Sequence, residues 1–241
     1  MKKILCLLTF TIWFISVENC TAGEVLVQSR WTDSTIVVDG NPEDWGKFPM
    51  THFEKGNVSL GAVNDSEYLY LMLSFRDQAS ARFLQSKVTL WLDKTASKEK
   101  LLGFCYTGSP PPIRKEQEFQ DSEDNLTQRP VEMPKIVTIL ENKDTLGMIP
   151  TYSEKGPAII TSYQQGFYFH EIRVPLKRND STRFAIGAPL DATLSLGLEL
   201  GGGPGGRPGD GKQLPGKQEF WLKVSLAQSS QPAAEKSKEN K

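Results

Sequence analysis

The aromatic side chains are the residues of this chain best suited to chemistry. Sugar rings present apolar C–H faces that stack on Trp or Tyr, and their hydroxyls form hydrogen bonds at the ring edge. In the run Val88-Thr-Leu-Trp-Leu-Asp93, strand alternation puts Trp91 on a face opposite Val88, Leu90 and Leu92. Tyr152 follows in a polar loop. The sequence therefore predicts Trp91 and Tyr152 as ligand-binding residues, although a Trp in a two-layer fold can equally lie under a loop.

Three other residues are predicted to be buried. Trp45 and Trp221 have apolar neighbours, which favour core positions for both rings. Cys105 is the cysteine that remains once Cys6 and Cys20 are assigned to a leader peptide, so no disulfide framework is expected. We interpret Cys105 as a small, buried apolar side chain.

Acidic and histidine side chains give weaker signals. Asp77 and Asp93 end neighbouring predicted strands, where turn capping is the favoured role and a structural calcium ion is the alternative. No metal ligands are assigned. His52 and His170 are far apart and belong to no metal-binding motif, so we interpret them as surface residues.

The sequence lacks the motifs of an enzyme. A glycine-rich segment, 201–216, matches the spacing of phosphate and dinucleotide loops, but Gln213 replaces the Ser or Thr that would hold magnesium, and Pro215 blocks the helix that must follow. There is no Gly-x-Ser-x-Gly turn, and Cys105 has no obvious histidine partner. We predict a protein that is not an enzyme and needs no cofactor.

The elements that must position these residues are strands. Apolar residues alternate before and after the turn Asn64-Asp65-Ser66, which predicts a β-hairpin, and similar signals recur every 10 to 20 residues from Val25 to Phe220. Helical periodicity is absent apart from one turn at 79–85. The prediction is an all-β, antiparallel, jelly-roll-like sandwich with little helix and long loops at 107–134 and 201–216.

Four motifs in register resemble the family 9 carbohydrate-binding modules and the related DOMON-like sandwiches. They are Val38-Asp39-Gly40 with Asp44-Trp45, the hairpin around Asn64-Asp65-Ser66, the strand ending at Asp93, and Glu171 before Ile172-Arg-Val-Pro-Leu176. The resemblance implies a non-catalytic binding module, most plausibly for a carbohydrate. Two alternatives stay open: a DOMON-type haem-binding redox domain, and a structural or partner-binding envelope protein without a small ligand.

The haem alternative depends on histidine and methionine ligands. DOMON-like relatives hold haem b between such side chains, yet no pairing is evident among the candidates here, and no Cys-x-x-Cys-His motif is present for covalent attachment. The candidates are His52, His170, Met50, Met72, Met133 and Met148.

The two ends of the chain are predicted to lie outside the folded domain. Residues 1–22 have two lysines and then a short apolar run, as a signal peptide does, so the protein is expected to be exported to the periplasm or the extracellular space. Cleavage is favoured over a lipid anchor at Cys20, because Glu18 and Asn19 are unlike a lipobox. The remaining divisions are an N-terminal edge segment at 23–34, the module at 35–226 and a disordered tail at 227–241.

Charge narrows the class of partner. Removing Lys2, Lys3 and Glu18 from 28 basic and 29 acidic side chains leaves 26 and 28. Nucleic acids and anionic membranes require a basic face, so neither is an expected partner. The expected partner is a glycan or a glycosylated surface, and the mature chain is expected to lack an integral membrane segment.

Overall fold

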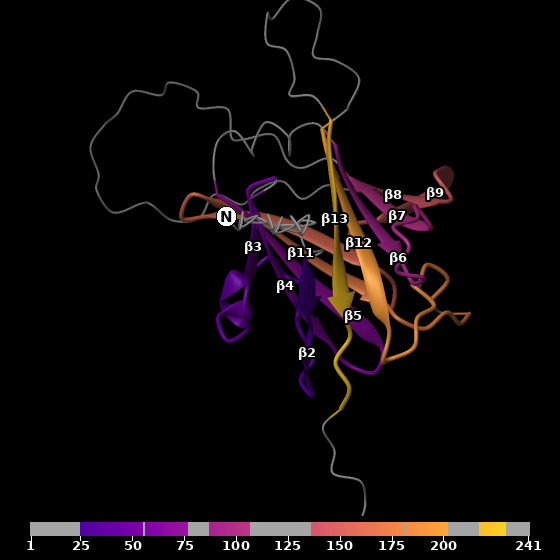
Figure 1. Ribbon diagram of the computed structural model, residues 1–241, viewed down its shortest axis with the longest axis horizontal. Coiled ribbons are helices and arrows are strands. Elements are labelled where there is room, and N and C mark those ends of the chain that lie inside the picture. Colours follow the sequence, from indigo (N-terminus) through magenta and orange to yellow (C-terminus); the bar gives the residue numbers. More distant parts are fainter. Residues whose placement is uncertain are drawn as a thin grey trace, which may run out of the picture.

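The protein is a two-layer β-sandwich. The computed structural model describes residues 25–54, 56–76, 87–106, 136–180, 182–201 and 217–229. Figure 1 shows the seven-stranded sheet crossing the six-stranded sheet. In spatial order, the seven-stranded sheet contains β1 (Leu26–Gln28), β13 (Gln218–Ser225), β12 (Thr193–Leu200), β6 (Val88–Asp93), β7 (Leu102–Tyr106), β8 (Ile136–Glu141) and β9 (Asp144–Pro150).

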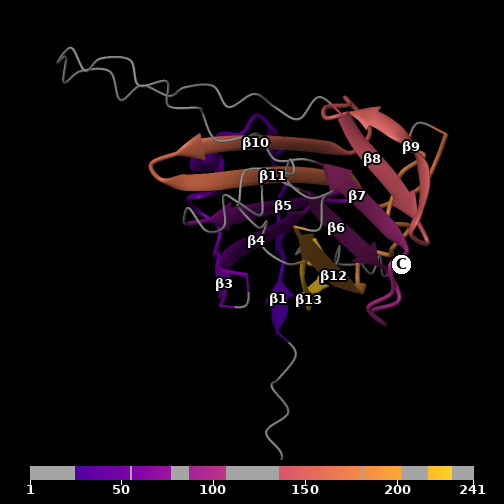
Figure 2. The ribbon, with the colours of Figure 1, turned by 90° about the horizontal axis from the view of Figure 1, so that it is seen from above.

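The six-stranded sheet forms the second layer (Figure 2). Its order is β10 (Ala158–Gln164), β11 (Phe167–Pro175), β5 (Tyr68–Phe75), β4 (Val58–Asn64) and β2 (Arg30–Trp31), with β3 (Thr51–Phe53) also pairing with β4. The predicted all-β sandwich is confirmed. It is not wholly antiparallel, because β1 pairs with β13 and β2 pairs with β4 in parallel.

Alternating side chains build the core between the two sheets. On β12, Leu194, Leu196, Leu198 and Leu200 point inward, and Val88, Leu90 and Leu92 do so on β6. The predicted hairpin joins β4 to β5, and Asp65 Oδ1 fixes its turn by accepting from the N–H groups of Glu67 and Tyr68, both at 2.7 Å. This alternation leaves the intervening side chains on the two outer faces of the sandwich.

A short N-terminal segment joins the two layers. The edge strand expected at Val25–Val27 is present as β1, and two residues after it the chain enters the other sheet as β2. Ser29 lies between them and donates to Asn64 Oδ1, while the Ala227 N–H donates to the Ser29 hydroxyl at 2.9 Å and to Asn64 Oδ1 at 2.8 Å. This junction of Ser29, Asn64 and Ala227 connects segments from both layers.

The outer face of the six-stranded sheet is covered by the chain itself. The 3-10 helix Pro42–Trp45, capped by Asn41, carries Trp45 onto this face, where the ring is buried as predicted. Glu171 of β11 holds the covering segment: its Oε2 accepts from the N–H groups of Asp39 at 3.0 Å and Gly40 at 2.9 Å, and its Oε1 accepts from Trp45 Nε1 at 2.8 Å. Burial raises the pKa of Glu171, although these hydrogen bonds oppose the rise. A second apolar cluster results, of Ile36, Val38, Trp45, Val63, Tyr70, Met72, Ala158 and Ile160.

Several sequence predictions concern residues outside this description. They are the signal peptide at 1–22, the helical turn at 79–85, the loop at 107–134, most of the loop at 201–216 and the tail from 230 onward. Within the described ranges, no helix is long and apolar enough to span a membrane.

Candidate ligand-binding face

The outer face of the seven-stranded sheet carries two tryptophans in one row. Across β13, β12, β6 and β7, the residues opposite one another are Trp221, Gly197, Trp91 and Gly103. A tryptophan therefore alternates with a glycine from one strand to the next. Each glycine leaves room for the indole ring of a neighbouring strand. A Cβ atom on Gly197 would lie 2.8 Å from the Trp221 ring, and a Cβ atom on Gly103 would lie 2.5 Å from the Trp91 ring.

Trp91 lies on the predicted face but is enclosed there. Its side chain shares the outer face with Thr89 and Asp93, opposite the inner leucines, as strand alternation predicts. It is nevertheless only 3% exposed, and the Lys100 ammonium lies 5.8 Å from its ring centroid. Among the described residues, Nε1 of Trp91 has no hydrogen-bond partner.

Trp221 is the more accessible of the two rings, which corrects the prediction that it is a core residue. Phe220 and Leu222 point into the core, and Trp221 between them points outward and is half-buried. The signal for this placement is the period of two along β13, which outweighs the apolar character of the neighbours.

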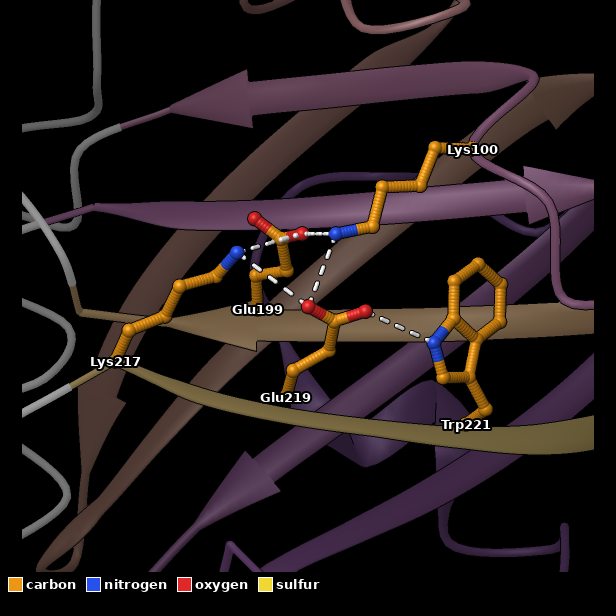
Figure 3. A network of polar contacts seen from close by, with 5 residues as sticks. All are labelled: Lys100, Glu199, Lys217, Glu219 and Trp221. Carbon is orange, nitrogen blue, oxygen red and sulfur yellow. Dashed lines mark hydrogen bonds and ion pairs between the residues drawn. The ribbon is translucent and has the colours of Figure 1, made fainter.

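A network of charged groups lies beside Trp221. Glu199 and Glu219 are direct cross-strand neighbours on β12 and β13, an arrangement that is unfavourable for like charges unless cations intervene. Figure 3 shows Lys100 and Lys217 approaching the two carboxylates from either side. Lys100 Nζ donates to Glu199 Oε1 and lies 2.9 Å from Glu219 Oε2, and Lys217 Nζ lies 3.1 Å from Glu199 and 3.4 Å from Glu219.

The same network orients the indole of Trp221 and fixes the charge of its partner. Trp221 Nε1 donates to Glu219 Oε1 at 3.0 Å. Partial burial opposes ionisation of Glu219, but hydrogen bonds from Lys100, Trp221 and Lys217 outweigh it and lower the pKa of Glu219 to about 2. Burial likewise opposes the charge of Lys100, and the two glutamates raise its pKa. The network therefore presents ordered acceptors and donors next to an aromatic ring.

Tyr152, the other predicted ligand-binding residue, lies on the opposite layer. Its ring is 53% exposed, and the guanidinium carbon of Arg173 is 5.8 Å from its centroid. Arg173, on the outer face of the six-stranded sheet, also lies 5.0 Å from the centroid of Tyr68. The structure therefore does not bring Trp91 and Tyr152 together, and no single ligand face contains both.

One of the two histidines is not at the surface, where the sequence predicts both to lie. His52 is exposed as predicted, whereas His170 is 1% exposed on the inner face of β11. Its Nδ1 is 2.7 Å from the Tyr106 hydroxyl, and its ring packs against those of Phe75 and Tyr106. Burial lowers the pKa of His170 to about 3, which keeps the imidazole neutral. These contacts favour a structural role over haem ligation.

Asp93 acts as a turn cap, the favoured interpretation of this carboxylate. Its Oδ1 accepts from Thr95 N–H at 2.8 Å, and its Oδ2 accepts from Ser97 N–H at 2.8 Å and Glu99 N–H at 2.9 Å. Asp77 lies outside the described residues. The described residues contain no group of three or more His, Cys, Asp or Glu side chains that could hold a metal ion. Cys105 is half-buried on the outer face beside Thr89, not buried as predicted, because it alternates with Phe104.

A cavity beside the covering segment of the six-stranded sheet lies away from these residues. It has a volume of about 400 Å³ and adjoins the 3-10 helix. Its lining is mostly polar or charged, including Glu43, Asp44 and Lys47, and no described lining residue is aromatic. A sugar ring would therefore have no stacking partner there, and Trp221 remains the better candidate.

Comparisons with known proteins give distant structural matches. No family model and no curated protein sequence matches the chain. Among solved structures, the chain is similar to a carbohydrate binding module family 9 from Caldicellulosiruptor kristjanssonii in complex with glucose, at 11% identity over 87% of this chain and 99% of that chain, with a TM-score of 0.44. It is also similar to one from the same organism in complex with cellotriose, at 12% identity over 88% and 98%, with a TM-score of 0.41. Both of these structures are members of the family that the motifs between Val38 and Leu176 resemble. The residue roles given for this chain depend on the geometry described above and not on these matches.

Proposed function

We propose that this chain is a non-catalytic carbohydrate-binding module that holds a sugar against Trp221 on the outer face of its seven-stranded sheet. One observation carries the proposal. A half-buried indole ring that keeps contact with solvent, seated on Gly197, lies directly beside an ordered network of two carboxylates and two ammonium groups.

The chemistry of this face matches that of a sugar. An aromatic ring stacks on the axial C–H groups of a pyranose, while the equatorial hydroxyls need acceptors and donors at the ring edge. Glu219 and Glu199 supply acceptors, and Lys217, which is 48% exposed, supplies a donor. Because the ion pairs already hold these groups in place, a ligand would lose little side-chain entropy on binding.

The same groups are poorly suited to hydrolysis. A glycosidase needs one carboxyl group that stays protonated near neutral pH and a second that is ionised. Here a pKa of about 2 keeps Glu219 ionised, and both carboxylates are paired with lysines. We therefore favour binding without catalysis, by a protein whose residues 1–22 are expected to direct it to where extracellular glycans occur.

Calorimetric titration tests the proposal. Glucose and cellotriose, the ligands of the two similar structures, are the first probes, followed by a glycan array. Replacing Trp221 with Ala should weaken binding of the sugar that binds best by at least about fivefold, since a stacked aromatic contributes roughly 1–3 kcal/mol. Tyr152→Ala, on the other layer, is the matched control and should leave the affinity unchanged.

Two results would contradict the proposal. Equal affinities for the parent and Trp221→Ala would remove this face as the site. Absence of binding across the whole glycan array would favour the alternative of a structural or partner-binding protein without a small ligand.

A further inference from the structure

A smaller cavity lies at one end of the sandwich and shares no residue with the Trp221 face. It has a volume of about 220 Å³, and it lies where the ends of β6, β7, β8 and β9 meet the segment that follows β11. Several of its lining residues are apolar, and Leu92 and Ile186 among them are buried. The apolar lining residues are Leu92, Leu101, Leu102, Leu146, Phe184, Ala185 and Ile186.

The charged lining residues of this cavity are mostly basic. Lys94, Arg178 and Arg183 are exposed, and Glu141 is the acidic residue among them. Arg178 lies 3.9 Å from Glu141, with side chains that are 58% and 46% exposed, which makes a weak ion pair. Within the described part of the chain, neither Lys94 nor Arg183 pairs with a carboxylate. The cavity therefore has an excess of positive charge beside an apolar lining.

The walls of the cavity are held in place by the backbone. The Ile186 N–H donates to the Pro175 carbonyl at 2.9 Å, and the Asn142 N–H donates to the Leu101 carbonyl at 3.0 Å. The guanidinium carbon of Arg183 lies 5.5 Å from the ring centroid of Phe184, a contact that restricts the arginine. A ligand would thus meet a largely preformed site, which lowers the entropy cost of binding.

We propose that this cavity binds a small carboxylate with an apolar body. The carboxylate lies at Arg178 and Arg183, whose guanidinium groups form paired hydrogen bonds with such a group, and the body lies on the leucines. A neutral apolar ligand would leave the cations unused, and a fully hydrophilic anion would leave the apolar lining in water. Such a ligand can be a fatty acid or the C-terminus of a peptide that ends in an apolar residue.

Titrations with matched pairs of ligands test whether the cavity binds a carboxylate, and they distinguish a fatty acid from a peptide C-terminus. Hexanoate represents the fatty acid, and N-acetyl-L-leucine represents the peptide terminus. Hexanamide and N-acetyl-L-leucinamide are their neutral controls. In calorimetry with the purified protein, we expect at least one carboxylate to bind about tenfold more tightly than its amide, because a charge-assisted pair is lost in the amide. Equal binding of acid and amide, or binding of neither acid, would overturn the proposal.

Charge variants locate the site. Arg178→Gln and Arg183→Gln should each weaken carboxylate binding by about tenfold, whereas Glu141→Gln removes the opposing carboxylate and should strengthen it. Lys217→Gln, in the Trp221 network, should have no effect on this ligand. Thermal melts verify that each variant is folded. Unchanged affinity in both folded arginine variants would place the ligand elsewhere and overturn the assignment. Sugar binding at Trp221 is measured separately, so the two proposals can fail independently.

Discussion

The two outer faces of the sandwich carry the same pair of residues in different surroundings. On the six-stranded sheet, Trp45 donates its indole N–H to Glu171 at 2.8 Å, and on the seven-stranded sheet Trp221 donates to Glu219 at 3.0 Å. The first pair lies beneath the segment that contains the 3-10 helix, and no cation from the described ranges contacts Glu171, so burial raises the pKa of this carboxyl group. The second pair contacts two lysines, and the pKa of Glu219 is lowered to about 2.

This difference separates a structural pair from one that is available to a ligand. Glu171 uses its carboxylate oxygens to bind the covering segment and has no exposed surface. Glu219 retains contact with solvent, as does the ring of Trp221. A Trp–Glu pair on a sheet therefore indicates a binding face only when no part of the chain covers it.

Replacing the tryptophans of the seven-stranded sheet should give the largest effects. Trp91→Ala is expected to lower the free energy of unfolding by about 3–5 kcal/mol, because it empties a buried site between Gly103 and Lys100. Trp221→Ala should cost less than about half of that, because its ring is only half-buried. Urea denaturation of both variants measures the difference. Similar losses would mean that the two rings are equally structural.

Replacing the glycines beside the tryptophans with alanine should have intermediate effects on stability and binding. A methyl group on Gly103 would push directly against the buried ring of Trp91, so Gly103→Ala should destabilise the protein by about 1–3 kcal/mol. Gly197→Ala should instead displace the accessible ring of Trp221 and weaken sugar binding with a smaller loss of stability. Calorimetric titration and thermal melts of the two variants report these quantities. A reversed order would contradict the assignment of Trp221 as the ligand-contacting ring.

The smallest expected effect is a difference in how low pH changes the contributions of Glu219 and Glu171 to folding stability. The folded-state pKa of Glu219 lies below the ordinary value of 4.5, so its stabilising contribution is present above pH 4.5 and is lost as the pH falls toward 2. The folded-state pKa of Glu171 lies above 4.5, so the folded protein takes up this proton before the unfolded chain does, and the cost of burying the charge disappears as the pH falls.

Glutamine variants provide the measurement. The stability difference between the parent and Glu219→Gln should shrink between pH 4.5 and pH 2. The difference between the parent and Glu171→Gln should move in favour of the parent as the pH falls through the raised pKa of Glu171. Other groups, including His170, titrate alike in parent and variant and cancel. Parallel pH profiles for the two variants would contradict the contrast between the faces.

The sequence predicts the strands and their faces better than it predicts exposure. Alternation along Val88–Asp93 correctly places Trp91 on an outer face, and the same rule, applied to Phe220 and Leu222, places Trp221 there too. Applied to β11, it would also have placed His170 on the inner face with Ile172. These placements follow from local periodicity alone.

Exposure depends on contacts between distant segments, which periodicity does not reveal. Lys100 covers Trp91 and reaches Glu199, 99 residues away, only because β6 pairs with β12. Likewise, Tyr152 and Trp91 lie on different layers because of the strand order, not because of any property of either residue. The charged network beside Trp221 could not be predicted for the same reason.

The junction of Ser29, Asn64 and Ala227 has a consequence for how the protein acquires its fold. The β1 strand pairs with β13, so Leu26 lies opposite Lys223, and β13 in turn occupies an interior position of its sheet. A chain emerging from the ribosome can form the β4–β5 and β10–β11 hairpins early, because their partners are close in sequence. The edge of β12 stays unpaired until residues 218–225 are made, and closing the junction requires Ala227 as well. We therefore expect the seven-stranded sheet to close only once residues 218–227 are available, and until then β12 has an open edge of the kind that promotes aggregation.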